Sequence, residues 1–216
     1  MSKRYLVALD QGTTSSRAVV FTLSGAQVAS ASREFRQIYP QPGWVEHDPN
    51  DILSSQITAL REAVQRADIE PQQIAAIGIT NQRETTLLWE KDTGTCVHNA
   101  IVWQCRRSAS YVEKLQAEGC SSLVRERTGL IPDAYFSATK LQWLLNEHGQ
   151  RTRAEKGELL FGTVDSFLAW HLVEGHPHVT DATNAARTML YNLHTQAWDE
   201  ELLRLFGIPQ AILPAV

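Results

Sequence analysis

Two short apolar runs, separated by a stretch rich in hydroxyl groups, lie near the start of the chain. They form the segment LVALDQGTTSSRAVVF, from Leu6 to Phe21. The apolar runs are typical of buried β-strands, so the sequence predicts a strand–loop–strand unit. Hydroxyl side chains add little to packing, and the glycine makes the backbone more flexible. We therefore expect the loop to hold something outside the chain.

The residue types in this loop suit a phosphate group and its metal ion. The phosphate-binding candidates are Gly12, Thr13, Thr14, Ser15 and Arg17. Glycine permits close approach of the backbone, and grouped hydroxyl and amide donors suit phosphate oxygens. Asp10 lies at the end of a predicted strand, where a carboxylate can hold a hydrated Mg²⁺ ion. The alternative is a polar turn whose hydroxyls bind nearby backbone groups. No G-x-x-x-x-G-K-[ST] motif occurs, so the loop is not a P-loop.

Further strands and a long helix follow. The expected strands are residues 4–9, 17–23, 26–36 and 74–80, with a turn at Ser24-Gly25. The last of these is continuously apolar, which predicts a central strand covered on both faces. Asp48 is expected to cap a helix that has Pro49 in its first turn. The expected apolar face of this helix comprises Leu53, Ile57, Leu60, Val64 and Ala67.

The second half of the chain is predicted to be mainly helical. The expected helices are about 107–118, 121–128, 137–148, 164–173 and 199–206. Before them, TTLLWE and CVHNAIVW flank Asp92-Thr93-Gly94 and predict a hairpin. Strands followed by helices predict an α/β fold, a mixed sheet with helices on its faces.

The composition excludes several classes of protein. A net charge of −4 and a pI near 6.0 do not favour binding to nucleic acid or to an anionic membrane. Three cysteines without metal-site spacing indicate free thiols. The apolar run near the N-terminus is too short for a signal peptide, and no stretch reaches the length of a transmembrane helix. We therefore expect a cytoplasmic protein.

Several motifs, in order along the chain, resemble the FGGY carbohydrate kinase family, and within it the members that phosphorylate glycerol. The motifs are DQGTTSSR, PGWVEHDPNDI, AIGITNQRETTLLW, VWQCRR, YFSATKLQWLL, GTVDSFLAWHL and HVTDATNAARTMLYN. The resemblance implies a ribonuclease H-like domain of the actin-like ATPase superfamily. It also implies ATP and Mg²⁺ as cofactors and glycerol as substrate. The full-length protein would be a dimer or a tetramer.

The same resemblance identifies the expected glycerol contacts as Arg83, Glu84 and Tyr135, with Trp103 as an aromatic wall. Arg only donates hydrogen bonds and ionised Glu only accepts them, so together they can satisfy a polyol hydroxyl. An adjacent Arg-Glu pair is otherwise most often a solvated surface turn, and a lone Trp is most often part of a core. Asp165 and Asp181 are interpreted as structural residues at turns or helix ends.

The resemblance also implies that the catalytic base is an Asp in a Gly-Asp-Gln-Gln stretch, which the 216 residues do not contain. We therefore expect residues 1–216 to be the N-terminal kinase domain, incomplete at its C-terminal end, without a catalytic residue and without the second domain. Two alternatives remain open: another FGGY sugar kinase of the xylulose or gluconate type, and a non-catalytic actin-like domain.

Overall fold

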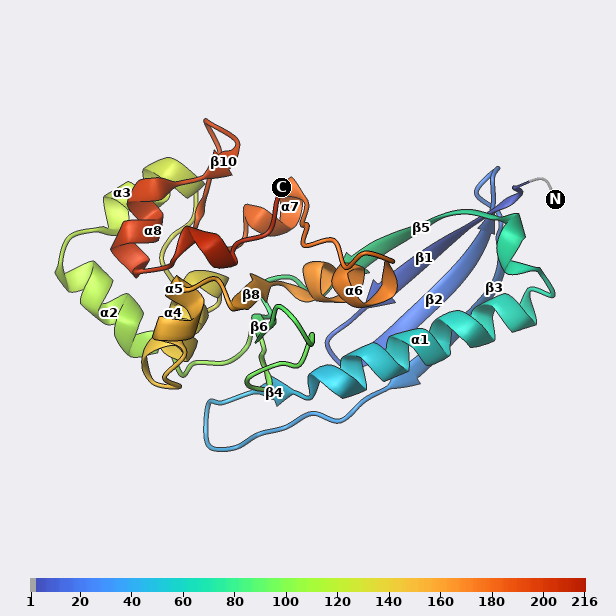
Figure 1. Ribbon diagram of the computed structural model, residues 1–216, viewed down its shortest axis with the longest axis horizontal. Coiled ribbons are helices and arrows are strands. Elements are labelled where there is room, and N and C mark those ends of the chain that lie inside the picture. Colours follow the sequence, from blue (N-terminus) through green and yellow to red (C-terminus); the bar gives the residue numbers. More distant parts are fainter. Residues whose placement is uncertain (1–2) are drawn as a thin grey trace. The chain divides into compact units, whose positions relative to one another are not determined.

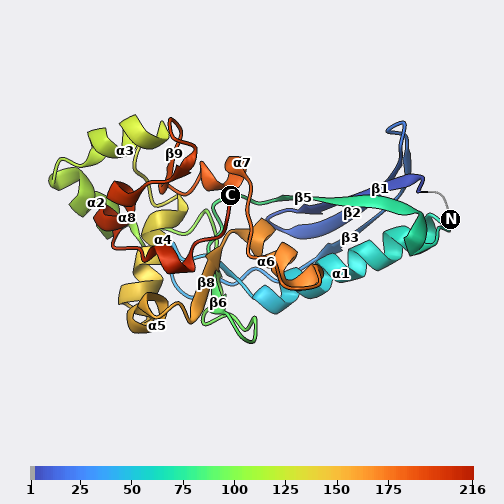
Figure 2. The same ribbon diagram turned by 45° about the horizontal axis from the view of Figure 1, so that its top comes forward.

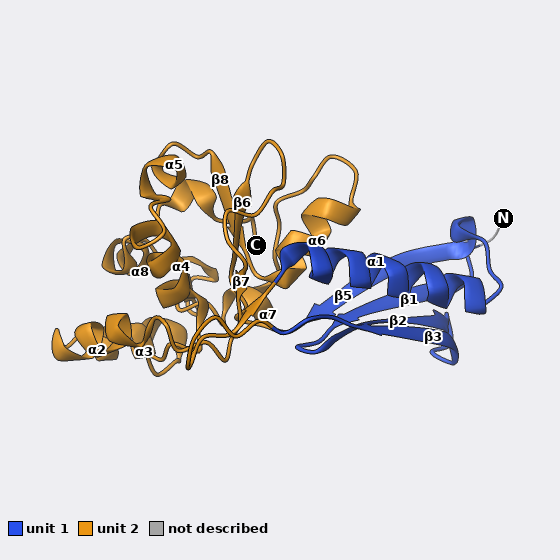
Figure 3. Cartoon of the chain, turned by 90° about the horizontal axis from the view of Figure 1, so that it is seen from below, with its two compact units in different colours: residues 1–37, 48–82 blue, residues 38–47, 83–216 orange. Residues whose placement is uncertain are grey.

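The computed structural model describes residues 3–216 and divides the chain into two compact units, coloured separately in Figure 3. Unit 1 contains the chain up to Gln37 together with Asp48–Gln82. Unit 2 contains Ile38–His47 and Arg83–Val216. Each unit is therefore built from two separate stretches of the sequence.

Unit 1 is a four-stranded mixed sheet with one long helix along it (Figures 1 and 2). Its strands are β1 (Tyr5–Gln11), β2 (Ser15–Thr22), β3 (Gln27–Glu34) and β5 (Ile74–Asn81), in the order β3-β2-β1-β5. The first three are antiparallel neighbours, and β5 runs parallel to β1. The three predicted N-terminal strands, and the mixed sheet itself, are confirmed.

Helix α1 (Pro49–Arg66) begins as predicted, because the Asp48 carboxylate accepts a hydrogen bond from the Asn50 amide at 2.8 Å. The predicted apolar face is present, but it is not the most buried face of the helix. Its members Leu53, Ile57, Leu60, Val64 and Ala67 are only partly buried. The buried residues are instead Pro49, Ile52, Ser55, Gln56, Ala59 and Ala63. Small side chains such as Ala59 and Ala63 let the helix approach β2 and β3 closely, and the larger side chains flank this contact.

The prediction of a central, doubly covered strand at 74–80 is wrong. Within the described residues β5 pairs with β1 alone, and Ile77 is 48% exposed. An open hollow of about 600 Å³ lies between α1 and β5, with Leu60, Val64 and Ile74 in its lining. The apolar run therefore does not predict how far this strand is covered, because α1 packs mainly on β2 and β3.

Unit 2 consists mainly of short helices, with three pairs of short strands and four isolated bridges. Its helices are α2 (Ala109–Ala117), α3 (Ser121–Thr128), α4 (Ser137–Asn146), α5 (Arg151–Glu155), α6 (Val164–Leu172), α7 (Ala182–Ala185) and α8 (Glu200–Phe206). Its strands are β4 (Glu46–His47), β6 (Leu87–Glu90), β7 (Ala100–Ile101), β8 (Leu159–Gly162), β9 (Tyr191–Asn192) and β10 (Ala197–Trp198). All five predicted helices are confirmed to within about two residues at each end, whereas α5 and α7 were not predicted. Two 3₁₀ turns complete the chain, Pro71–Gln73 in unit 1 and Gln210–Ile212 in unit 2.

The predicted hairpin around Asp92-Thr93-Gly94 is confirmed only as an irregular one. Bridges join Trp89 to Cys96 and Thr86 to Ile101. The regular ladder of β6 forms instead with β8, far along the sequence. The core of unit 2 gathers around these strands and α4, and includes Leu88, Leu141 and Phe161.

A buried ion pair lies beside this core. The Arg107 Nη2 atom is 2.5 Å from Oε1 of Glu46, and neither side chain is more than 6% exposed. The guanidinium group lies over the rings of Trp44 and Trp143, at 3.8 and 4.8 Å from their centroids. Aromatic faces attract cations, so the two rings add to the ion pair in holding Arg107.

The three cysteines are free, as predicted. No helix in residues 3–216 has both the length and the apolar character needed to cross a bilayer.

A pH dependence of stability follows from His47, which is fully buried. Burial lowers the pKa of His47 from its ordinary value of 6.5 to about 4. Between these pH values the unfolded chain binds a proton that the folded chain does not, so stability falls as the pH drops from 6.5 to 4. The difference corresponds to roughly 3 kcal/mol. Urea unfolding of the chain and of His47→Gln at several pH values between 4 and 6.5 measures this difference. Plots of unfolding free energy against pH that stay parallel for the two proteins would contradict the prediction.

Candidate functional site

The phosphate candidates lie in a tight connection between β1 and β2 of unit 1. Asp10 lies opposite Arg17 in the antiparallel register, and Gln11 lies opposite Ser16. The amide of Gly12 donates to the Ser15 carbonyl at 2.9 Å, which closes the turn. The loop candidates are therefore brought together as the sequence predicted.

Glutamine side chains fix the backbone of this loop. The amide group of Gln82, which follows β5, donates to Oε1 of Gln11 at 3.0 Å and to the Gly12 carbonyl at 3.2 Å. The Gln37 amide donates to the Thr13 carbonyl at 3.0 Å. These bonds consume carbonyl groups of the loop, which are acceptors and would repel a phosphate.

Gly12 has a structural role that the sequence did not show. A Cβ atom added there would lie 3.1 Å from the Ser15 carbonyl oxygen, so the turn itself leaves little room for a side chain. Thr14 and Arg17, whose side chains carry donors, are exposed, and so is the Asp10 carboxylate. A loop with fixed carbonyls and exposed donors fits an anionic ligand.

The metal candidate is a single carboxylate. Asp10 is exposed at the end of β1, and residues 3–216 contain no group of three His, Cys, Asp or Glu side chains suited to a metal ion. Magnesium usually keeps several waters and binds through one or two carboxylates and substrate phosphates. The chemistry of Asp10 therefore fits a hydrated Mg²⁺ ion that phosphate oxygens help to hold.

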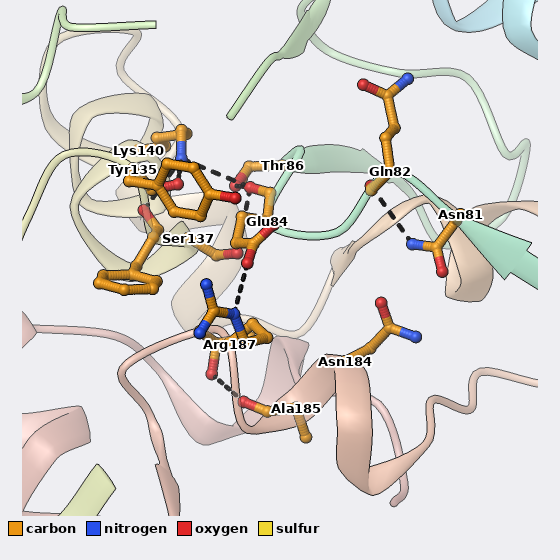
Figure 4. Close-up of polar contacts among 12 residues, drawn as sticks. Asn81, Gln82, Glu84, Thr86, Tyr135, Ser137, Lys140, Asn184, Ala185 and Arg187 are labelled. Carbon is orange, nitrogen blue, oxygen red and sulfur yellow. Dashed lines mark hydrogen bonds and ion pairs between the residues drawn. The ribbon is translucent and has the colours of Figure 1, made fainter. Parts of the chain in front are cut away.

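The polyol candidates lie in unit 2 and are not equivalent. Glu84 is 2% exposed, whereas Arg83 beside it is exposed. Within the described residues no ion pair joins the two. Glu84 instead pairs with Arg187, whose Nε atom donates to Oε1 of Glu84 at 2.5 Å (Figure 4). Arg83 therefore leaves its donors available at the surface, and Glu84 is already held by another cation.

The aromatic candidates lie together. The rings of Trp103 and Tyr135 are tilted against each other with centroids 5.4 Å apart. Each residue is partly buried. The backbone carbonyls of Tyr135 and Glu84 both accept from Nζ of Lys140 (labelled in Figure 4). The structure thus places Tyr135 close to Glu84 and gives it the aromatic neighbour that the resemblance implied.

Lys140 of α4 is fully buried and lies next to Glu84 and Tyr135. Its Nζ atom donates to the carbonyls of Phe136 at 3.1 Å and Glu84 at 3.5 Å, and also to that of Tyr135. Burial lowers the pKa of Lys140 to about 7, and the nearby Glu84 charge offsets part of this effect. The Lys140 side chain therefore ties the backbone of two polyol candidates to α4.

The two acidic residues interpreted as structural occupy such positions. Asp181 caps α7 by accepting from the Asn184 amide at 2.9 Å. Asp165 lies in the first turn of α6 and accepts from the Thr180 hydroxyl at 2.6 Å and from Thr163. Burial raises the pKa of Asp165.

Sequence reasoning missed two residues of this site, Arg187 and Lys140. They lie in the quoted motifs HVTDATNAARTMLYN and YFSATKLQWLL. A charged residue between apolar or small neighbours was the available signal.

Comparison with known proteins finds that this chain is similar to carbohydrate kinases. The model of the N-terminal domain of the FGGY family of carbohydrate kinases matches residues 5–216. A glycerol kinase of Shewanella piezotolerans is 61% identical over all of this chain and 44% of its own length. One from Pseudothermotoga lettingae is 58% identical with the same coverage. The chain therefore spans less than half the length of these relatives.

Solved structures agree. A Plasmodium falciparum glycerol kinase with ADP superimposes with a TM-score of 0.91 at 31% identity, over 99% of this chain and 43% of that one. A gluconate kinase from Lactobacillus acidophilus gives 0.88 at 27% identity, over 99% and 42%. The predicted ribonuclease H-like, actin-like fold class is confirmed by these neighbours.

Proposed function

Because the chain belongs to the FGGY family of carbohydrate kinases, we propose that it is the N-terminal part of a glycerol kinase, which transfers a phosphoryl group from ATP to glycerol and yields sn-glycerol 3-phosphate. The observation that carries the proposal is the high identity to glycerol kinases along the entire chain. The longer protein to which this chain would belong is called the parent below.

The site in unit 2 supports a polyol substrate. Arg83 offers exposed donors, and Glu84 offers a carboxylate oxygen as an acceptor. Polyol hydroxyls both donate and accept hydrogen bonds, so such a pair can orient them. Tyr135 and Trp103 add an aromatic surface for the carbon chain.

The loop of unit 1 supports ATP. Thr13, Thr14, Ser15 and Arg17 would bind phosphate oxygens, and Gly12 would keep the turn tight. Asp10 would hold Mg²⁺ through water, and the ion would neutralise charge on the phosphates. Phosphoryl transfer depends mainly on positioning and electrostatics, which are what these residues would provide.

We further propose that the catalytic base is an Asp outside these 216 residues, that the parent is a dimer or tetramer, and that it works in the cytoplasm. The proposal of a distant base rests on the absence of a GDQQ motif from the sequence.

A substrate panel tests the function. The parent is assayed with ATP and glycerol, xylulose, gluconate or rhamnulose, and the highest kcat/KM is expected with glycerol. Preference for another substrate would favour a different FGGY sugar kinase. Such an enzyme is among the structural neighbours, which include a gluconate kinase. Glycerol binding without turnover in the parent would favour a non-catalytic actin-like domain.

Replacing Arg83 with Ala in the parent is expected to raise KM for glycerol and to lower kcat. A substrate hydroxyl would lose its charged donor, at a cost on the order of 1–3 kcal/mol, or about fivefold to 150-fold in kcat/KM. Steady-state kinetics at saturating ATP measure the effect. Arg125→Ala, at an exposed position of the same unit, is the control. If both variants keep the parent's kinetics, Arg83 is a surface residue.

A further inference from the structure

Glu84 has a backbone conformation that needs support from its surroundings. Its φ angle is +65°, in the left-handed region that non-glycine residues rarely adopt. Its carbonyl oxygen accepts from Thr86 Oγ1 at 3.1 Å, Ser137 Oγ at 3.2 Å and Lys140 Nζ at 3.5 Å. These three donors account for the backbone of Glu84 but not for the direction of its carboxylate.

The carboxylate is directed by Arg187 alone. Oε1 of Glu84 accepts from Nε of Arg187, whereas Oε2 has no hydrogen-bond partner in residues 3–216. The Glu84 side chain is 3% exposed, so its rotation is restricted to a small space. Arg187 therefore fixes one carboxylate oxygen, and the hydrogen-bonding capacity of the other is not used by residues 3–216.

Arg187 is itself held in place. It follows α7, and its guanidinium carbon lies 4.9 Å from the ring centroid of Phe136 and 5.7 Å from that of Tyr135. Its side chain is 30% exposed. A planar guanidinium that stacks on aromatic rings while it binds a carboxylate has a fixed orientation, which a lysine would not reproduce.

We infer that Arg187 is a positioning residue of the polyol site: it orients the Glu84 carboxylate so that Oε2 can accept a hydrogen bond from a polyol hydroxyl. The inference rests on the proposed function for the identity of the ligand. The geometry that carries it, the contact between Arg187 and Glu84, does not depend on that function (Figure 4).

The first test uses the kinetics of the parent with Arg187→Met, Arg187→Lys and the control Arg127→Met. Arg127 pairs with Glu201 at 3.2 Å, in a more exposed ion pair of the same unit. Arg187→Met is expected to raise KM for glycerol at least tenfold and to change KM for ATP less than twofold. Arg187→Lys should recover part of the loss, and Arg127→Met should match the parent. A change in glycerol KM below twofold for Arg187→Met would overturn the inference, and so would an equal rise in both KM values.

The second test does not need kinase activity. In the 216-residue chain labelled with ¹³C at glutamate Cδ, the signal of Glu84 is assigned with Glu84→Gln. Arg187→Met should shift this signal and leave that of Glu201 in place, and Arg127→Met should do the reverse. An unchanged Glu84 signal in Arg187→Met would overturn the inference. A parent that phosphorylates no glycerol, together with a shifted Glu84 signal, would instead overturn the proposed function and leave the positioning role supported.

Discussion

Replacing Arg107 with methionine is expected to lower the free energy of unfolding by about 3–5 kcal/mol, because it leaves the charge of Glu46 buried without its cation. The Arg107 side chain is 0% exposed, and that of Glu46 is 6% exposed. Burial raises the pKa of Glu46, but hydrogen bonds from Asn99 and Arg107 outweigh burial and keep it below its ordinary value. The variant also loses the cation between Trp44 and Trp143.

Arg106→Met is the matched control for this prediction. Arg106 is adjacent in sequence and pairs with Asp133 at 2.5 Å, but its side chain is 53% exposed. Exposed ion pairs contribute about 0–1 kcal/mol, so this variant should unfold almost like the original chain. Adding Glu46→Gln to Arg107→Met should restore part of the loss by removing the unpaired charge. Urea unfolding followed by tryptophan fluorescence measures all of these variants. A loss below about 1 kcal/mol for Arg107→Met would contradict the prediction. It would show that Glu46 becomes solvated or protonated without a large loss of unfolding free energy.

The 216-residue chain by itself is expected to have no measurable glycerol kinase activity. It carries the proposed phosphate loop and polyol residues, but no GDQQ motif for the base, and it spans less than half of its relatives. Loss of an essential group and of an enclosing wall removes positioning and exclusion of water, which together commonly cost several powers of ten in rate.

A coupled assay of ADP release with glycerol tests this expectation, with the parent at equal molarity as the positive control. A parent variant that lacks the GDQQ aspartate sets the background. Turnover of the chain within tenfold of the parent would contradict the prediction, and it would place the base among these 216 residues.

Local sequence signals predicted the elements that depend on local interactions. The strand–loop–strand unit around Gly12 forms between neighbouring segments, and the Asp48 cap acts on the amide of Asn50 two residues away. These features need no information about distant parts of the chain.

The features that could not be predicted depend on contacts across the chain. The apolar pattern of α1 marked its larger side chains, but close packing on the sheet selected Ala59 and Ala63. The regular partner of β6 is β8, and two-residue strands such as β4 and β7 carry no periodicity. At the candidate site, Arg187 is 103 positions from Glu84, so no spacing rule connects them.

The division of the chain into units restricts how it can be dissected. Because residues 38–47 belong to unit 2 while the residues on both sides belong to unit 1, no single cut yields either unit whole. A protein fragment of residues 83–216 would contain Arg107 and Trp143 but would lack Trp44 and Glu46. A ten-residue peptide covering Ile38–His47, added in trans, would supply these groups. Unit 2 is thus suited to fragment complementation, in which binding of a short peptide reports whether the larger piece has folded.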